Sequence, residues 1–296
     1  MQDLLISIFC DIDDFCKEYD QYLKTSLLIE NTENKYEFPK SSMCLSEVMC
    51  IVTHFHLSNF RTFKSYYIEC IQGRYRKYFP KAVSYNRFLE LMEYALFPLL
   101  LYTLKFKNGK CTGISFIDST TLDVCDSHRI HCNKVFKGLA KRGKSSTGWF
   151  YGFKLHLVIN DKGEILSFCI TSGNVDDRNL SVIEPLSREL FGKLFADKGY
   201  ISQKVFDSLF SNGITLVTKI KKNMKNKLMS LYDKVILRKR AVIESVNDFL
   251  KNICQIEHSR HRKPLNFLVN LVAGIAAYSF LPKKPSLKLD NLPFGL

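Results

Sequence analysis

Three patterns that would each indicate a different class of protein are missing from this sequence of 296 residues. Its ten cysteines form no Cys-x-x-Cys pair, so their spacing favours free, reduced thiols over a disulfide framework or a zinc finger. No stretch reaches the ~20 apolar residues that a membrane-spanning helix needs. The first eight residues carry Asp3 and no basic cluster, unlike a secretory signal. We therefore expect a soluble, cytoplasmic protein with no membrane partner.

Acidic residues are scarce relative to basic ones. The 29 Asp and Glu residues stand against 43 Lys and Arg residues, which gives a formal net charge of +14. Hydrophobic residues at 46% and charged residues at 24% are typical of a folded protein rather than a disordered one. A positive surplus of this size suggests a polyanionic partner, with nucleic acid first and an anionic membrane second.

The first 105 residues have apolar side chains at helical intervals, and Ser84 has the position of an N-cap before Phe88. This pattern predicts an all-helical N-terminal domain over residues 1–105. The domain either binds DNA through a helix-turn-helix-like element or serves only in packing or dimerisation.

From residue 106 the pattern changes to short β-rich segments alternating with helices. It predicts an α/β domain over residues 106–285, in which a mixed sheet is flanked by helices, followed by a C-terminal tail at 286–296. Strands are predicted at 113–118, 150–159, 165–171, 194–197 and 214–220, and helices at 177–190, 202–210, 240–253 and 266–280.

The helix predicted to begin at residue 240 has two distinct faces. An apolar stripe that starts at Val242 has the spacing of a core-facing surface, whereas Arg240, Glu244 and Lys251 fall together on another edge. Taken alone, these three residues are most simply a solvated row of salt bridges, each worth about 0.2–0.5 kcal/mol.

Two aspartates make a different interpretation of Glu244 possible. Asp118 and Asp197 each end a short apolar segment just before a turn, and ligands of open α/β sheets bind at the carboxyl ends of strands. A single Asp in such a place is more often a turn cap. Together with Glu244, however, the pair would form an oxygen-rich cluster that suits magnesium or manganese. Two such ions ~3.5–4 Å apart can hold the attacking and leaving oxygens of a phosphoryl transfer.

Three further motifs have competing interpretations. Residues 138–145 match Gly-x4-Gly-Lys-Ser, but no strand is predicted before them, so a basic loop that contacts DNA phosphate is preferred to a nucleotide-binding loop. His156 is either a histidine on the sheet surface or a residue facing the metal cluster or DNA. Trp149, the only tryptophan, either packs or stacks on an unpaired base. A zinc site at 125–132 has unsuitable spacing.

Several blocks of this sequence resemble insertion-sequence DDE transposases, and the nearest resemblance is to the insertion-sequence family numbered 982. It extends over roughly residues 105–285, and its most specific part is the block Gly-Lys-Ser-Ser-Thr-Gly-Trp-Phe-Tyr-Gly-Phe-Lys. The blocks are 116–120, 134–137, 142–156, 196–200, 240–251 and 256–262.

The resemblance implies a ribonuclease-H-like core in which Asp118, Asp197 and Glu244 are the catalytic carboxylates and hold two magnesium or manganese ions. The implied reaction is phosphodiester hydrolysis at the element's ends followed by strand transfer. In related transposases a Tyr stands three residues before the Arg of the acidic helix, and here Leu237 occupies that position. The residues expected to contact DNA are Arg240, Lys251, Lys198, Lys144, Arg142 and Lys154.

The resemblance also implies double-stranded DNA as the partner, both terminal inverted repeats and target DNA, bound by a homodimer. The implied location is the bacterial cytoplasm, at the nucleoid when the protein acts. Two alternatives stay open on the sequence. One is a catalytically silent DNA-binding protein derived from a transposase, and the other is a plain nuclease that cleaves without strand transfer.

Overall fold

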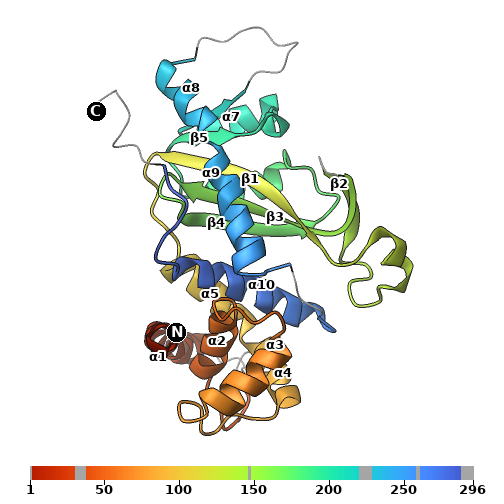
Figure 1. Cartoon of the computed structure of the whole chain (residues 1–296). Coiled ribbons are helices and arrows are strands. Elements are labelled where there is room, and N and C mark those ends of the chain that lie inside the picture. Colours follow the sequence, from red (N-terminus) through yellow and green to blue (C-terminus); the bar gives the residue numbers. More distant parts are fainter. Residues whose placement is uncertain (1, 31–37, 146–147, 220–228, 258–260, 288–296) are drawn as a thin grey trace. The chain divides into compact units, whose positions relative to one another are not determined.

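The computed structural model describes residues 2–30, 38–145, 148–219, 229–257 and 261–287 (Figure 1). These residues form two compact units. One unit comprises Met1–Lys107 with Phe249–Leu281, and the other comprises Asn108–Asp248 with Pro282–Leu296. The boundary predicted after residue 105 is close to the observed one, but residues 249–281 group with the N-terminal helices instead of with the α/β domain.

The first unit is helical. Its last helix, α10, is buried along almost its whole length and packs against α2, α4 and α5, which explains why it belongs to this unit. The elements are α1 (Gln2–Glu30), α2 (Leu45–Phe55), α3 (Phe63–Tyr66), α4 (Tyr85–Tyr94), α5 (Leu96–Phe106) and α10 (Pro264–Ser279), with π-helices η1 (Tyr67–Arg74) and η4 (Phe249–Ile253). No helix among the described residues is long and apolar enough to cross a membrane.

The predicted N-cap at Ser84 is present in the structure. Its hydroxyl accepts a hydrogen bond from the backbone N–H of Arg87 at 3.4 Å, at the start of α4. We expect Ser84→Ala to lower the free energy of unfolding by about 1 kcal/mol, because one N–H at the helix start loses its partner. Urea unfolding measures this change. The control is Ser202→Ala at the start of α7 (Gln203–Ser211), where the N-cap side chain makes no such bond and a smaller effect is expected.

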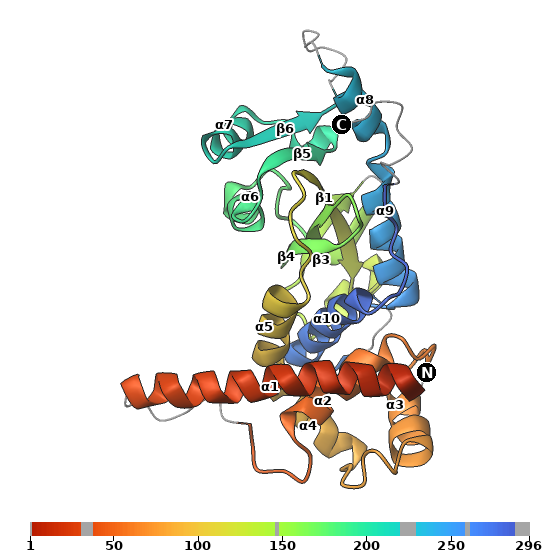
Figure 2. The ribbon, with the colours of Figure 1, turned by 90° about the vertical axis from the view of Figure 1, so that its left-hand side faces the viewer.

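The second unit is built around a six-stranded mixed sheet in the order β2-β3-β1-β5-β6, with β4 paired to β3 (Figures 1 and 2). β1, β2, β3 and β4 pair antiparallel, whereas β5 pairs parallel with β1 and β6. The strands are β1 (Ile114–Asp123), β2 (Lys141–Ser145), β3 (Gly148–Asn160), β4 (Ile165–Ser172), β5 (Gly192–Ala196) and β6 (Ile214–Thr218). The predicted mixed α/β sheet flanked by helices is therefore confirmed.

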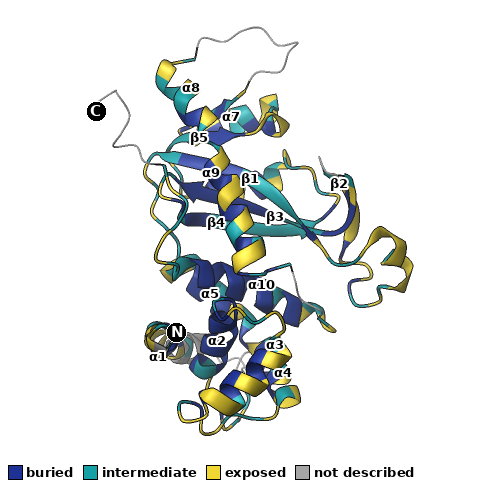
Figure 3. Ribbon diagram, viewed as in Figure 1, coloured by how far each residue is buried: buried dark blue, intermediate teal, exposed yellow. Residues whose placement is uncertain are grey.

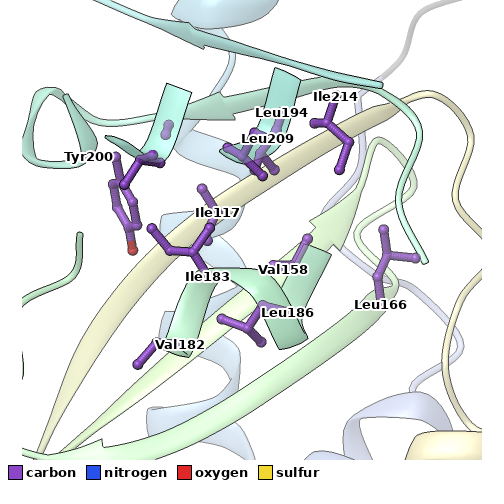
Figure 4. Close-up of a cluster of buried hydrophobic side chains, with 12 residues drawn as sticks. Ile117, Val158, Leu166, Val182, Ile183, Leu186, Leu194, Tyr200, Leu209 and Ile214 are labelled. Carbon is purple, nitrogen blue, oxygen red and sulfur yellow. The ribbon is translucent and has the colours of Figure 1, made fainter. Parts of the chain in front are cut away.

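Helices cover both faces of this sheet. Figure 2 shows α6 (Leu180–Ser187) and α7 (Gln203–Ser211) on one side of the strands and α9 (Ala241–Asp248) on the other. The hydrophobic core on the α6 and α7 side includes Ile117, Ile183 and Leu194 (Figure 4). On the opposite face the rings of Phe116 and Phe195 stack with their centroids 5.5 Å apart. The remaining helix, α8 (Leu231–Arg238), precedes α9.

Several predicted boundaries need correction. β1 does not end at Asp118 but runs on to Asp123, because β3 continues to pair with it. The predicted basic loop at 141–145 is the strand β2. The helix expected over 240–253 is interrupted: α9 ends at Asp248, and η4 then follows a wider π-helical course in which Cys254 N–H donates to Phe249 O at 2.9 Å.

Candidate active site

Strand pairing brings Asp118 and Asp197 next to each other. β1 and β5 pair in parallel up to Ile117 opposite Ala196; Asp118 is the next residue of β1, and Asp197 directly follows the end of β5. Neighbouring strands lie about 4.8 Å apart, so the two carboxylates start from adjacent backbone positions. Because side chains alternate between the faces of a strand, Asp118 lies on the side of Phe116, which is the face away from the Ile117 core.

Glu244 is carried by α9, which packs against β1. This helix buries Val242 and Val246 and leaves Glu244 exposed, so one of its faces is buried and the other open to solvent (Figure 3). The Glu244 side chain is 57% exposed, compared with 22% for Asp118. The three acids that were separated in sequence are thus supplied by two adjacent strands and the helix on their common face.

Arg240 lies between two of these acids. Its Nη2 is 2.5 Å from Oε1 of Glu244, and its Nη1 is 3.8 Å from Oδ2 of Asp118. The Nη1 atom is buried and has no hydrogen-bond partner among the described residues. Arg240 therefore acts as a charge partner of the acids in this structure, whereas the sequence predicted a contact with DNA phosphate.

The acids influence one another electrostatically. Burial raises the pKa of Asp118 from 3.8 to about 6, while the positive charge of Arg240 lowers it. A backbone hydrogen bond from Ser119 also lowers this pKa, and the negative charges of Glu244 and Asp197 raise it. A carboxyl whose ionised form is disfavoured by burial and by two like charges is stabilised by any cation that binds beside it.

The chemistry of this donor set fits a hard divalent cation, although the side chains are not arranged around one. Among the described residues no group of three His, Cys, Asp or Glu side chains is placed to hold a metal ion. Asp118, Asp197 and Glu244 offer oxygen atoms alone, which is what magnesium and manganese prefer. Arg240 occupies Oε1 of Glu244, so an ion shared by Asp118 and Glu244 would compete with this contact.

The residues expected to contact DNA fall into two groups. Lys198 follows Asp197 directly and is exposed, and Arg142 and Lys144 are exposed on β2. Lys154 and Lys251 are instead engaged in ion pairs with acids.

The Lys154 side chain is only 12% exposed and donates to Asp177 and to the carbonyl of Val175, both at 2.9 Å. Lys251 belongs to the helical unit and pairs with Glu257 at 3.2 Å. Both charges have partners within the chain, and the predicted contacts of these two lysines with DNA stay predictions.

His156 fits neither interpretation made from the sequence. It is buried opposite Ser119 on the α6 and α7 side of the sheet, and its Nε2 is 2.9 Å from the hydroxyl of Thr171. Its Nδ1 is 3.9 Å from Asp177. Burial lowers the pKa of His156 to about 4 against the opposing charge of Asp177, so the ring is neutral at neutral pH.

Sequence reasoning missed Asp177 and Tyr200. Asp177 binds Lys154 and lies close to His156. Tyr200 is buried three residues after Asp197, and burial, together with the charges of Asp118 and Asp177, raises its pKa. The turn sequence Gly-Asn-Val-Asp-Asp after β4 could have identified Asp177 as a candidate. No pattern in the residues around Tyr200 indicates that its side chain is buried.

Three other features of the sequence are the Gly-x4-Gly-Lys-Ser pattern, the segment with Cys125 and Cys132, and Leu237. The Gly-Lys-Ser of residues 143–145 lies in β2, so no helix follows it to receive a phosphate at its N-terminus. Cys125 and Cys132 are free thiols, the first before a short 3-10 helix (Ser127–Cys132) and the second at its last residue. Leu237, which replaces the expected Tyr, is a buried residue of α8 and does not lie on the helix that carries Glu244.

A family model for the transposase DDE domain matches residues 108–264, more than half of the chain. The chain belongs to this family. The matched part of the chain includes the six described strands and the three acids. A comparison with curated proteins gave no match.

Among solved structures, the chain is similar to a cryo-EM structure of the piggyBac transposase synaptic complex with hairpin DNA. The TM-score is 0.40 at 11% identity, over 64% of this chain and 50% of that one. The chain therefore spans half the length of the solved transposase that it matches.

Proposed function

We propose that this chain is an insertion-sequence transposase of the family numbered 982, and that Asp118, Asp197 and Glu244 hold two magnesium or manganese ions. The proposed fold is a ribonuclease-H-like core joined to an N-terminal helical domain. The observation that carries the proposal is the register of β1 and β5, which places Asp118 and Asp197 side by side on the face covered by the Glu244 helix.

The proposed reaction is hydrolysis of a phosphodiester at the element's end, after which the released 3′-hydroxyl attacks target DNA. Bound metal would supply Lewis-acid activation of water and charge stabilisation at phosphate. The three carboxylates would fix the reacting groups from one rigid face of the sheet. Arg240, once released from Glu244, and the exposed Lys198 would bind phosphate oxygens beside the cut.

The proposed partner is double-stranded DNA, both the terminal inverted repeats and the target. The net charge of +14 supports a polyanionic partner. We further propose that the transposase acts as a homodimer on DNA, in the bacterial cytoplasm and at the nucleoid.

One observation favours a second candidate function, a catalytically silent DNA-binding protein. Arg240 pairs with Glu244 and lies 3.8 Å from Asp118, so a protein cation already stands where a metal ion would bind. The test is a nicking assay with magnesium on a duplex that carries the inverted repeat flanking the gene. A nick at the repeat's end supports the transposase. Binding without any nick supports the silent protein, and nicking without strand transfer supports a plain nuclease.

A further inference from the structure

The ribbon formed by β2 and the start of β3 has a surface that the proposed chemistry does not use. β2 is the last strand at one edge of the sheet, and it pairs antiparallel with β3 so that Lys144 is opposite Trp149 (Figure 1). The face of β2 that carries Arg142 and Lys144 is exposed. We call Arg142, Lys144 and Trp149 together the aromatic-basic ribbon.

Trp149 is exposed although tryptophan usually packs. Its side chain is 57% exposed, with the guanidinium carbon of Arg142 4.9 Å and Nζ of Lys144 5.7 Å from the ring centroid. The opposite face of the ribbon is tightly packed, because a Cβ on Gly143 would lie 2.7 Å from the Phe150 ring. With the inner face filled in this way, Trp149 lies on the exposed face beside two cations of β2.

The surrounding sequence has an unusual charge distribution. Residues 127–160 contain no Asp or Glu, but they contain seven Lys or Arg residues. Neither Arg142 nor Lys144 forms an ion pair with an acid in the part of the chain that the structure describes. Cations that have no acidic partner can bind the phosphates of a nucleic acid, and an exposed aromatic ring can stack on one of its bases.

We propose that the aromatic-basic ribbon binds DNA by stacking the Trp149 indole on an unpaired base while Arg142 and Lys144 hold the flanking phosphates. This proposal rests on the proposed function for its partner and adds a contact site to it. Stacking on tryptophan tolerates any base, so the ribbon would recognise an unstacked position rather than a sequence.

The strand register fixes how far this contact lies from the acids. Asp118 pairs with Leu157 on β3, and Trp149 precedes Leu157 by eight residues on the same strand. At ~3.3 Å per residue the separation is at most about 26 Å along the strand. One DNA strand advances ~3.4 Å per nucleotide, so the unpaired base lies up to about eight nucleotides from the cut and not at the cut itself.

The test uses the tryptophan fluorescence of the full chain, excited at the long-wavelength edge of the absorption band where the 14 tyrosines do not absorb, so that it reports on Trp149 alone. Three probes are titrated: the inverted-repeat duplex, the same duplex with one unpaired base placed up to about eight nucleotides from its end, and single-stranded oligothymidine. We expect quenching that saturates with DNA binding measured by anisotropy. The mismatch-free duplex should bind more weakly than the probe with an unpaired base.

Two variants sharpen the result. Trp149→Ala should weaken binding of the unpaired-base probe about tenfold, the range of one base–aromatic stack. The double variant with Arg142→Ala and Lys144→Ala should lose about two phosphate contacts. The slope of the logarithm of the binding constant against the logarithm of the salt concentration should therefore become shallower by about two. Phe210→Ala is the control, because Phe210 is an exposed aromatic residue on α7 and its loss should leave binding unchanged.

The outcomes separate this proposal from the proposed function. DNA binding and cleavage without any change in fluorescence, or with equal affinity in Trp149→Ala, would overturn the ribbon proposal alone. A fluorescence change that depends on protein concentration without DNA would overturn it in favour of an interface between copies. Quenching by DNA without cleavage would overturn the proposed transposase activity and support the ribbon contact. A wild-type chain that binds no DNA would overturn both.

Discussion

Replacing Asp118 or Asp197 by Asn, or Glu244 by Gln, should lower the rate of DNA cleavage by at least about a thousandfold. The physical reason is the loss of a negatively charged oxygen ligand, which costs several kcal/mol of transition-state stabilisation at about 1.4 kcal/mol per tenfold. These substitutions keep the shape of each side chain, so DNA affinity should not fall. Gel-based cleavage rates and anisotropy on the same duplex measure the two effects.

The matched control for these variants is Asp207→Asn. Asp207 is an exposed acid on α7, on the opposite side of the sheet from α9, and its replacement should leave the cleavage rate unchanged. If any of the three active-site variants cleaves DNA at nearly the wild-type rate, the residue replaced in it is not part of the active site.

Asp118→Asn should also make the metal-free protein more stable at pH 7, by about 1–3 kcal/mol. Burial raises the pKa of Asp118 from 3.8 to about 6. Between these values the folded chain holds a proton that the unfolded chain has released, so stability falls as pH rises from about 4 to about 6. The loss persists at pH 7. Asn cannot ionise, so the variant does not lose this part of the free energy of unfolding. Arg240 keeps its contact with Glu244 in the variant.

The measurement is the free energy of unfolding of wild type and Asp118→Asn at several pH values, with a chelator present. The two proteins should differ at pH 7, and the difference should reach its low-pH limit only below about pH 3, where Asp118 is protonated in both the folded and the unfolded state. Added magnesium should stabilise the wild type more than the variant, since only the wild type has the complete site. A difference that does not change with pH would show that ionisation of Asp118 is not its cause.

The local part of the site could be predicted from the sequence. The pairing of Arg240 with Glu244 follows from their spacing of four residues at the start of a helix, and the structure has it. The contact of Arg240 with Asp118 could not be predicted, because it depends on how α9 packs on β1. In the structure Arg240 is therefore a partner of the acids, and its contact with DNA phosphate stays a proposal.

Strand boundaries failed where pairing between distant segments decided them. Ser-Thr-Thr after Asp118 looks like a turn, yet these residues extend β1 because residues 154–156 of β3 pair with them. Lys141–Ser145 looks like a basic loop, yet it becomes a strand beside the first residues of β3. Hydrophobic alternation, the usual signal for a strand, is missing from both segments.

The helix that carries Glu244 shows a similar limit. Its apolar stripe was expected to continue to Ile253, but the π-helical turn after Asp248 adds residues to each turn, and Ile253 is 44% exposed. The spacing used to place Lys251 beside Glu244 therefore does not hold beyond α9. Lys251 pairs with Glu257 in the helical unit instead.

The central claim, that Asp118, Asp197 and Glu244 together hold metal ions, is tested most directly by counting manganese ions bound to the protein–DNA complex. Electron paramagnetic resonance of free manganese gives this number. The wild type and Asp207→Asn should each bind two ions, while Asp118→Asn, Asp197→Asn and Glu244→Gln should each bind fewer. Equal manganese binding by the wild type and all three active-site variants would contradict the claim.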